Sequence, residues 1–310
     1  MTRDELRKLI RGTIVTLPTA FDDDFKVDFG RQVEMVHWWR EQGLGTDIAP
    51  LKSSAAMGEG PDLSDDEWPH LLRTVVNAAG SDAVVICGLK TKDTLHTIED
   101  AKRAQDLGAV GLQIDLPIFH HPNQDDYVRY FTDISDAIDI GIMIYNTHWF
   151  GAESITAETM LRLQDAEHVV AVKWSVPEGE DYDEMTKFSH IFNVIDNSHR
   201  QVRCHKNGGR GYISPTIAAY PQHDLEVWKL LEAHRYEEAQ AKIDRVREAL
   251  AAYSAECPKR SGGYSFGKGL SAVLGRPVGP PRPPTLPLNE YELAELKKTV
   301  QGLGWPVEVV

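Results

Sequence analysis

Eight short runs rich in β-branched and apolar residues alternate with longer amphipathic segments along the first two thirds of the chain. Each run has the length and composition of a buried strand, and each longer segment begins near a polar or capping residue. The predicted strands are residues 13–17, 46–50, 83–87, 111–115, 140–145, 169–173, 193–196 and 211–214. Predicted helices between them include residues 30–42, 65–79, 94–107, 125–137 and 156–164. This alternation predicts an α/β protein, a (β/α)₈ TIM barrel.

After Pro221 the pattern changes to helical segments alone. Residues 225–256 are rich in Ala, Glu, Arg and Leu and predict one long helix. A Gly- and Pro-rich connection, residues 275–284, leads to a last predicted helix at 290–303. We therefore expect a barrel over residues 1–222, carrying the active site, and a C-terminal helical extension over residues 223–310.

Net charge argues against nucleic-acid and membrane partners, and the cysteine content indicates a cytoplasmic protein. The 310 residues include 33 Lys and Arg against 47 Asp and Glu, a formal charge of -14, which repels nucleic acids and anionic membranes. Cys87, Cys204 and Cys257 are scattered and odd in number, as expected for reduced thiols in a cytoplasmic protein. The charged amino terminus lacks a signal-peptide pattern, and no apolar run reaches the length of a membrane span.

Lys173 is the strongest candidate for a catalytic residue. It ends the apolar run that begins at His168, where a barrel strand presents its last side chains to a pocket. An amine among apolar residues loses stabilisation of its charged form, so its pKa falls and it can attack a carbonyl carbon. A lysine at a strand end can also extend into solvent. Tyr145 ends the preceding run in the same way, and the pair favours a Schiff-base enzyme.

Further motifs stand at the predicted strand ends in a consistent order. They are Ala55-Ala-Met-Gly-Glu59, Leu116-Pro-Ile-Phe119, Tyr145-Asn146, Lys173, Gly208-Gly-Arg-Gly211 and the Gly-Pro-Pro-Arg-Pro-Pro element before the final helix. With these motifs the chain resembles, over nearly its whole length, the dihydrodipicolinate synthase and N-acetylneuraminate lyase family of pyruvate-dependent class I aldolases.

The resemblance implies a Schiff base between Lys173 and the ketone of pyruvate or another 2-oxo acid, with no cofactor. Tyr145 would relay protons beside the carbinolamine, and Ile213 would line the pyruvate side of the pocket. Residues 55–59 match the family's Gly-Thr-Thr-Gly-Glu motif, whose N–H groups and hydroxyls receive the carboxylate. The iminium acts as an electron sink for both C–C cleavage and water elimination. The resemblance also implies a homodimer or homotetramer, in which the loop of Phe119 reaches a neighbouring subunit's pocket.

Three hydroxyl groups of the family's proton relay are missing. Ala56 and Met57 replace the two threonines, and Phe119 replaces a tyrosine. Loss of an acid–base partner typically costs roughly 10²–10⁴-fold in rate. The remaining candidates to assist Tyr145 are water and the side chains of Ser53, Ser54, His120 and His148.

The residues after Tyr145 also depart from the family's biosynthetic branch. Phe150 stands where that branch has an arginine for the second substrate's carboxylate, so an authentic dihydrodipicolinate synthase is not expected. Met57, Phe119, Trp149 and Phe150 could each be packing residues, or together they could form an apolar wall of the pocket. The wall favours a pyruvate-type aldolase or hydratase-aldolase with a hydrophobic or aromatic aldehyde partner.

Two alternatives remain open. One is a sugar-acid dehydratase or aldolase of the same family, and the other is a catalytically silent protein that binds a 2-oxo acid. Retention of both Lys173 and Tyr145 argues against the silent protein, since binding alone does not need that pair. A metal site is not expected, because the histidines and cysteines show no ligand spacing.

Overall fold

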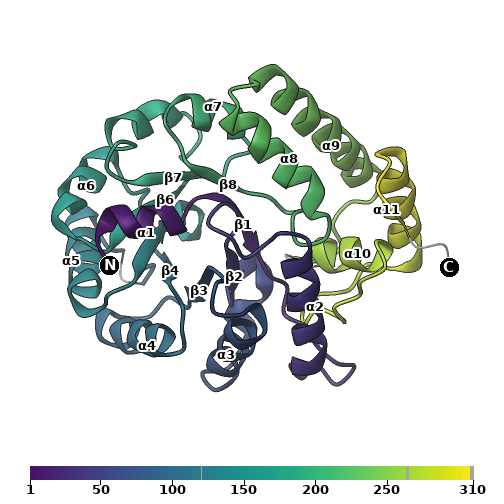
Figure 1. Ribbon diagram of the computed structural model, residues 1–310, viewed down its shortest axis with the longest axis horizontal. Helices are drawn as coiled ribbons and strands as arrows, with labels where there is room; N and C mark the ends of the chain where they lie inside the picture. Colours follow the sequence, from purple (N-terminus) through teal and green to yellow (C-terminus); the bar gives the residue numbers. More distant parts are fainter. Residues whose placement is uncertain (120, 263–264, 308–310) are drawn as a thin grey trace.

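The computed structural model describes residues 1–119, 121–262 and 265–307, and its eight parallel strands form one closed barrel in sequence order (Figure 1). The strands are β1 Gly12–Thr16, β2 Leu51–Ser53, β3 Val85–Leu89, β4 Gly111–Asp115, β5 Gly141–Tyr145, β6 Val169–Trp174, β7 Asn193–Asp196 and β8 Gly211–Ile213. β8 pairs with β1 and closes the sheet, so the predicted (β/α)₈ barrel is confirmed.

The helices of the described residues surround the barrel and continue beyond it. They are α1 Arg3–Leu9, α2 Phe29–Glu41, α3 Glu67–Ala79, α4 Thr94–Asp106, α5 Gln124–Ala137, α6 Ala157–Arg162, α7 Gln201–Lys206, α8 Pro221–Glu232, α9 Tyr236–Glu256, α10 Ser265–Val273 and α11 Glu290–Gly302. Local capping begins several of them. Asn123 and Asp126 form a capping box at α5, and the Asp93 side chain accepts the first N–H groups of α4. None of the described helices is long and apolar enough to cross a membrane.

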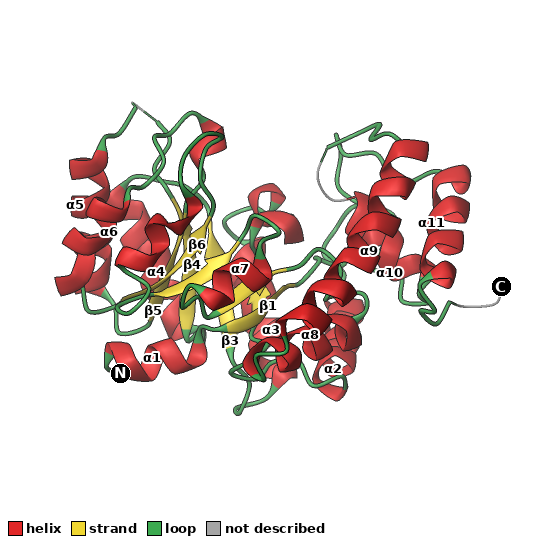
Figure 2. Ribbon diagram, turned by 90° about the horizontal axis from the view of Figure 1, so that it is seen from above, coloured by secondary structure: helices red, strands yellow, loops and turns green. Residues whose placement is uncertain are grey.

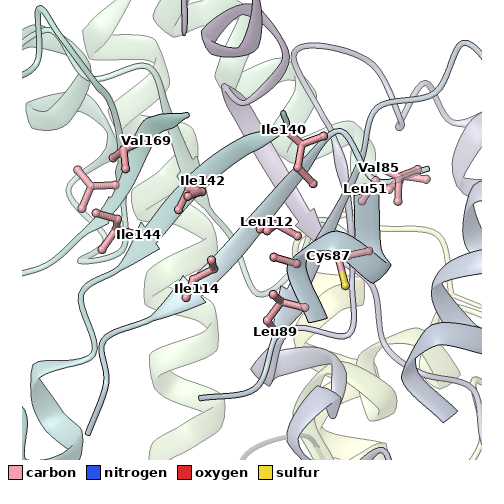
Figure 3. Packing of buried hydrophobic residues seen from close by; sticks show 14 of the residues in the cluster. Leu51, Val85, Cys87, Leu89, Leu112, Ile114, Ile140, Ile142, Ile144 and Val169 are labelled. Carbon is pink, nitrogen blue, oxygen red and sulfur yellow. The ribbon is translucent and has the colours of Figure 1, made fainter. Parts of the chain in front are cut away.

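The strands bury side chains on both faces. Outward residues such as Leu112, Ile114, Ile142 and Ile144 pack in the layer under the helices (Figure 3). Inward residues, with Leu6 of α1 and Ile10 at its C-cap, form a separate cluster at the amino-terminal end of the barrel. Its buried strand residues are Ile14, Ile86, Met143, Val170, Ala171 and Ile195. Because α1 fills this end, side chains at the carboxyl ends of the strands are left to form a site.

The prediction of the second strand was wrong in position. It was expected at residues 46–50 and lies at Leu51–Ser53, because Thr46 and Ala49 instead pair across a tight turn that ends at Pro50. Lys52 interrupts the apolar pattern and concealed the strand. The third strand also begins two residues later than predicted, at Val85, because the Val84 N–H donates to the Gly45 carbonyl outside the sheet.

The single helix predicted over residues 225–256 was also wrong. α8 ends at Glu232 and α9 begins at Tyr236, and His234 between them has a left-handed φ of 55°. Such a residue ends a helix. α10 was not predicted, since Gly267 and Gly269 weaken its helical signal. Division of the chain at residue 222 remains a proposal: α8 contacts β1 in the barrel and α9 in the extension.

The extension of α9, α10 and α11 lies to one side of the barrel (Figures 1 and 2). It has its own apolar cluster, which includes Tyr253, Leu270, Leu296 and Trp305. It docks on the segment after β2. There Lys268 of α10 approaches the buried Glu59 carboxylate to 2.7 Å, and the Arg282 N–H donates to the same carboxylate at 3.0 Å.

Candidate active site

Lys173 lies inside the barrel, near the carboxyl end of β6, and is buried. In the strand register it stands beside Tyr145 of β5, which stands beside Asp115 of β4. Neighbours in register project to the same face of a sheet, so the three side chains enter the interior at one level. The Lys173 Nζ is 3.5 Å from the centre of the Tyr145 ring. The predicted Lys173–Tyr145 pair is therefore brought together.

Burial sets the protonation of this pair. It lowers the pKa of Lys173 well below the ordinary value, and the nearby charge of Lys52 lowers it further. Burial also raises the pKa of Tyr145, with a smaller contribution from Asp115. Lys173 is thus favoured as a neutral amine and Tyr145 as a protonated phenol, the forms needed by a nucleophile and a proton donor.

A second buried lysine, Lys52 of β2, was missed in the sequence. Its Nζ donates to Gln113 Oε1 at 2.7 Å inside the barrel. Burial lowers the pKa of Lys52 to about 7 and raises the pKa of Asp115 to about 6. The signal that selected Lys173, a polar residue at the end of an apolar run, would also have found Asp115 at the end of β4. It would not have found Lys52, which lies in the middle of a three-residue strand.

The segment after β2 forms a short 3₁₀ turn, Ala56–Gly58. Gly58 is required, since a Cβ there would lie 2.1 Å from the Leu17 carbonyl oxygen. Thr19 Oγ1 donates to the Gly58 carbonyl at 2.6 Å and fixes the turn. Ala56 is half-buried, whereas Met57 is exposed.

The aromatic residues predicted around Tyr145 form a contiguous edge-to-face stack. Ring centres lie 5.4 Å apart for Tyr145 and Trp149, 4.9 Å for His148 and Trp149, and 6.1 Å for Trp149 and Phe150. Trp149 and Phe150 are exposed. Burial lowers the pKa of the half-buried His148, whose Nε2 lies 3.3 Å from Ser175 Oγ. A neutral imidazole is suited to exchanging protons.

The remaining predicted residues lie apart from this stack. Phe119 is 71% exposed, and His120 lies outside the described residues. Ile213 of β8 stands beside Ile14 and packs on the interior cluster. Ser53 and Ser54 are buried with their Oγ atoms 3.2 Å apart. Among the residues predicted to assist Tyr145, His148 contacts the Trp149 ring, which in turn contacts the Tyr145 ring.

A separate cavity of about 450 Å³ lies between the barrel rim and the extension. Its lining is mostly apolar and includes Met57, Leu250 and Phe266, together with the buried Asp224, but neither Lys173 nor Tyr145. Ser214 and Thr216 donate to Asp224 Oδ2 at 3.0 and 2.9 Å. The carboxylate is thereby satisfied internally. Within residues 1–119, 121–262 and 265–307, no group of three or more His, Cys, Asp or Glu side chains is placed to hold a metal.

A (β/α)₈ barrel with a buried lysine beside a tyrosine on the neighbouring strand defines a lyase of the class I aldolase type. The chain belongs to the dihydrodipicolinate synthetase family, whose family model matches residues 9–303.

Two curated relatives are similar over nearly the full chain, and a third is similar over about half of it. A 4-hydroxy-tetrahydrodipicolinate synthase of Chlorobaculum parvum is 27% identical over 309 residues, covering 96% of this chain and 98% of the relative. The enzyme of that name from Acidothermus cellulolyticus is 28% identical over 303 residues, covering 97% and 95%. The one from Cutibacterium acnes is 35% identical over 161 residues, covering 52% and 53%.

Solved structures share the fold at lower identity. Dihydrodipicolinate synthase from Aquifex aeolicus has a TM-score of 0.84 at 20% identity, covering 97% of this chain and all (100%) of that one. The Acinetobacter baumannii enzyme complexed with pyruvate gives 0.82 at 22% identity, covering 96% and 99%. YagE of E. coli K12, a prophage protein also in complex with pyruvate, gives 0.83 at 21% identity, covering 96% and 99%.

Proposed function

We propose that the chain is a lyase that forms a Schiff base between Lys173 and a 2-oxo acid of the pyruvate type. The observation that carries the proposal is the buried Lys173 amine, held against the ring of Tyr145 and favoured in its neutral form. Family membership and the two relatives of known structure in complex with pyruvate support the same ligand class.

The proposed chemistry balances with groups of this chain. The Lys173 amine attacks the ketone carbon, and the carbinolamine loses water as Tyr145 donates a proton to the departing hydroxyl. The Tyr145 phenolate then takes the proton of the substrate hydroxyl while the iminium accepts the electron pair of the breaking C–C bond, so the aldehyde leaves and an enamine remains. Protonation of the enamine carbon and hydrolysis then release pyruvate and restore Lys173.

The proposed carboxylate site is the 3₁₀ turn after β2. The N–H groups of Gly58 and Glu59 are used within the turn, where they donate to the Ala55 and Ala56 carbonyls. Among the described residues, the Ala56 and Met57 N–H groups make no such hydrogen bond. Two adjacent backbone donors at the start of a turn suit an anion, and they do not depend on the missing threonine hydroxyls.

We propose that the rest of the substrate is apolar, because the exposed surface beside Tyr145 is formed by Trp149 and Phe150. Burying an aromatic group there gains about 25 cal/mol per Å² of apolar area. A polyhydroxylated chain would lose its hydrogen bonds to water without replacement. The absence of an arginine at Phe150 also argues against aspartate semialdehyde, whose carboxylate would lack a bidentate partner.

The test is reductive trapping followed by a substrate comparison. Pyruvate with borohydride should label Lys173, and Lys173→Ala should take up no label there. Label at another residue would contradict the mechanism. Steady-state rates on an arylidene pyruvate should then exceed those on 2-keto-3-deoxy sugar acids, and the reverse order would favour the sugar-acid alternative.

A silent 2-oxo-acid-binding protein is the second candidate, because Ala56, Met57 and Phe119 supply no relay hydroxyl. It predicts trapping on Lys173 without turnover of any member of the substrate panel. Turnover with any of them removes this candidate.

A further inference from the structure

Lys52 is a second amine inside the barrel, 1% exposed. In the strand register it stands beside Ile86 of β3, which packs in the interior cluster, so the lysine also faces inward. Its Nζ reaches Gln113 Oε1 on β4 at 2.7 Å. Burying a lysine at such a position destabilises the fold unless its ammonium group is paired and hydrogen-bonded.

Asp115 is the only carboxylate among the described groups that face this interior. It lies close enough to Lys52 and to Lys173 to interact electrostatically with both. Tyr145 of β5 is the fourth titratable group there. The other inward positions of the strands are uncharged, and they include Ile14, Ile86, Met143, Ala171, Ile195 and Ile213.

Two amines and one carboxylate therefore share one buried space. A single carboxylate compensates one ammonium, and a second ammonium would be buried without a counterion. Lys52 has the oxygen acceptor, Gln113 Oε1. Lys173 faces the Tyr145 ring and makes no side-chain hydrogen bond among the described residues. The proton is thus better placed on Lys52.

We propose that Lys52 is a positioning residue for Lys173: it carries the positive charge of the barrel interior, with Asp115 as counterion, and so leaves the Lys173 amine neutral and nucleophilic. This role rests on the proposed function of Lys173. The lowered pKa of Lys173, for which Lys52 is the second cause after burial, is consistent with it.

The experiment measures the rate of imine trapping on Lys173 against pH, with pyruvate and cyanoborohydride and with peptide mapping at each pH. Removing the Lys52 charge leaves Asp115 to stabilise protonated Lys173. In Lys52→Met the midpoint should therefore move to higher pH by on the order of one unit, the size typical of one nearby charge. Below the midpoint, trapping should be about tenfold slower.

Two further variants separate charge from structure. Lys52→Arg keeps the charge and should hold the midpoint near that of the wild type. Asp115→Asn removes the counterion and should move the midpoint to lower pH, opposite to Lys52→Met. If Lys52→Met does not fold, Lys52→Gln also removes the charge and should move the midpoint in the same direction. A control is Lys242→Met, a lysine of α9 outside the barrel interior that pairs with Glu226, which should not move the midpoint.

The outcomes distinguish this role from the proposed function. Wild-type label on Lys173 with an unchanged midpoint in Lys52→Met overturns the role of Lys52 alone. Absence of label on Lys173 in the wild type overturns the proposed function. Wild-type label on Lys52 overturns both, because it makes Lys52 the nucleophile.

Discussion

Lys268→Met should destabilise the fold more than any surface ion-pair variant. Glu59 is 1% exposed and its Oε2 lies 2.7 Å from the Lys268 Nζ without a well-directed hydrogen bond, so the attraction is ionic. Removing one partner of a buried pair costs about 3–5 kcal/mol, because the other charge stays buried. The lost hydrogen bond from Lys268 to the Pro280 carbonyl adds about 1 kcal/mol.

Equilibrium urea unfolding of the wild type, Lys268→Met and the double variant Glu59→Gln/Lys268→Met measures the effect. The double variant should recover most of the loss, since glutamine still accepts the Arg282 N–H that now donates to Glu59 Oε1. A deficit below about 1 kcal/mol in Lys268→Met, the range of an exposed pair, would refute the reasoning.

The loss of stability in Lys268→Met relative to the wild type should depend on pH. Burial already raises the pKa of Glu59 in the folded protein, with Lys268 opposing the rise. Without Lys268 the pKa of Glu59 in the folded protein rises further. At pH values between the ordinary pKa of Glu59 and this raised pKa, the folded state binds more protons than the unfolded state. Stability then falls as the pH rises through that window. The deficit should be larger at about pH 8 than at about pH 5, and a deficit independent of pH would contradict this origin.

Three further outcomes are expected. Tyr145→Phe should lower turnover by roughly 10²–10⁴-fold and slow trapping on Lys173 without moving the label to another residue, measured by steady-state kinetics and peptide mapping. Light scattering should show a dimer or tetramer, because the 71% exposed Phe119 suits a subunit contact, and a monomer at micromolar concentration would contradict this. Cys87 and Cys204 should resist alkylation in the native protein, since burial raises the pKa of both thiols; rapid labelling would count against it.

The barrel and the Lys173–Tyr145 pair could be predicted from the sequence for one physical reason. A parallel strand buried on both faces gives an unbroken apolar run, and a polar residue at its end then stands out. Lys52 was missed because it lies inside a three-residue strand and breaks the run that would have marked it. Asp115 was assigned to a strand, but its neighbours in space depend on the register of β4 with β5. Register is set by closure of the barrel, which no local pattern contains.

The turn at His234 could not be predicted for a related reason. Residues on both sides of it have good helix propensity, and the break comes from α8 packing against β1 and α9 folding back on α8. Tertiary contacts therefore override the local signal.

Packing of Leu6 and Ile10 in the interior cluster closes the amino-terminal end of the barrel. In the proposed reaction, substrate and both products would therefore enter and leave from the carboxyl end, where Trp149 and Phe150 are exposed. The aldehyde product would pass these rings as it leaves, so the residues proposed to favour an apolar substrate would also affect how fast its product is released.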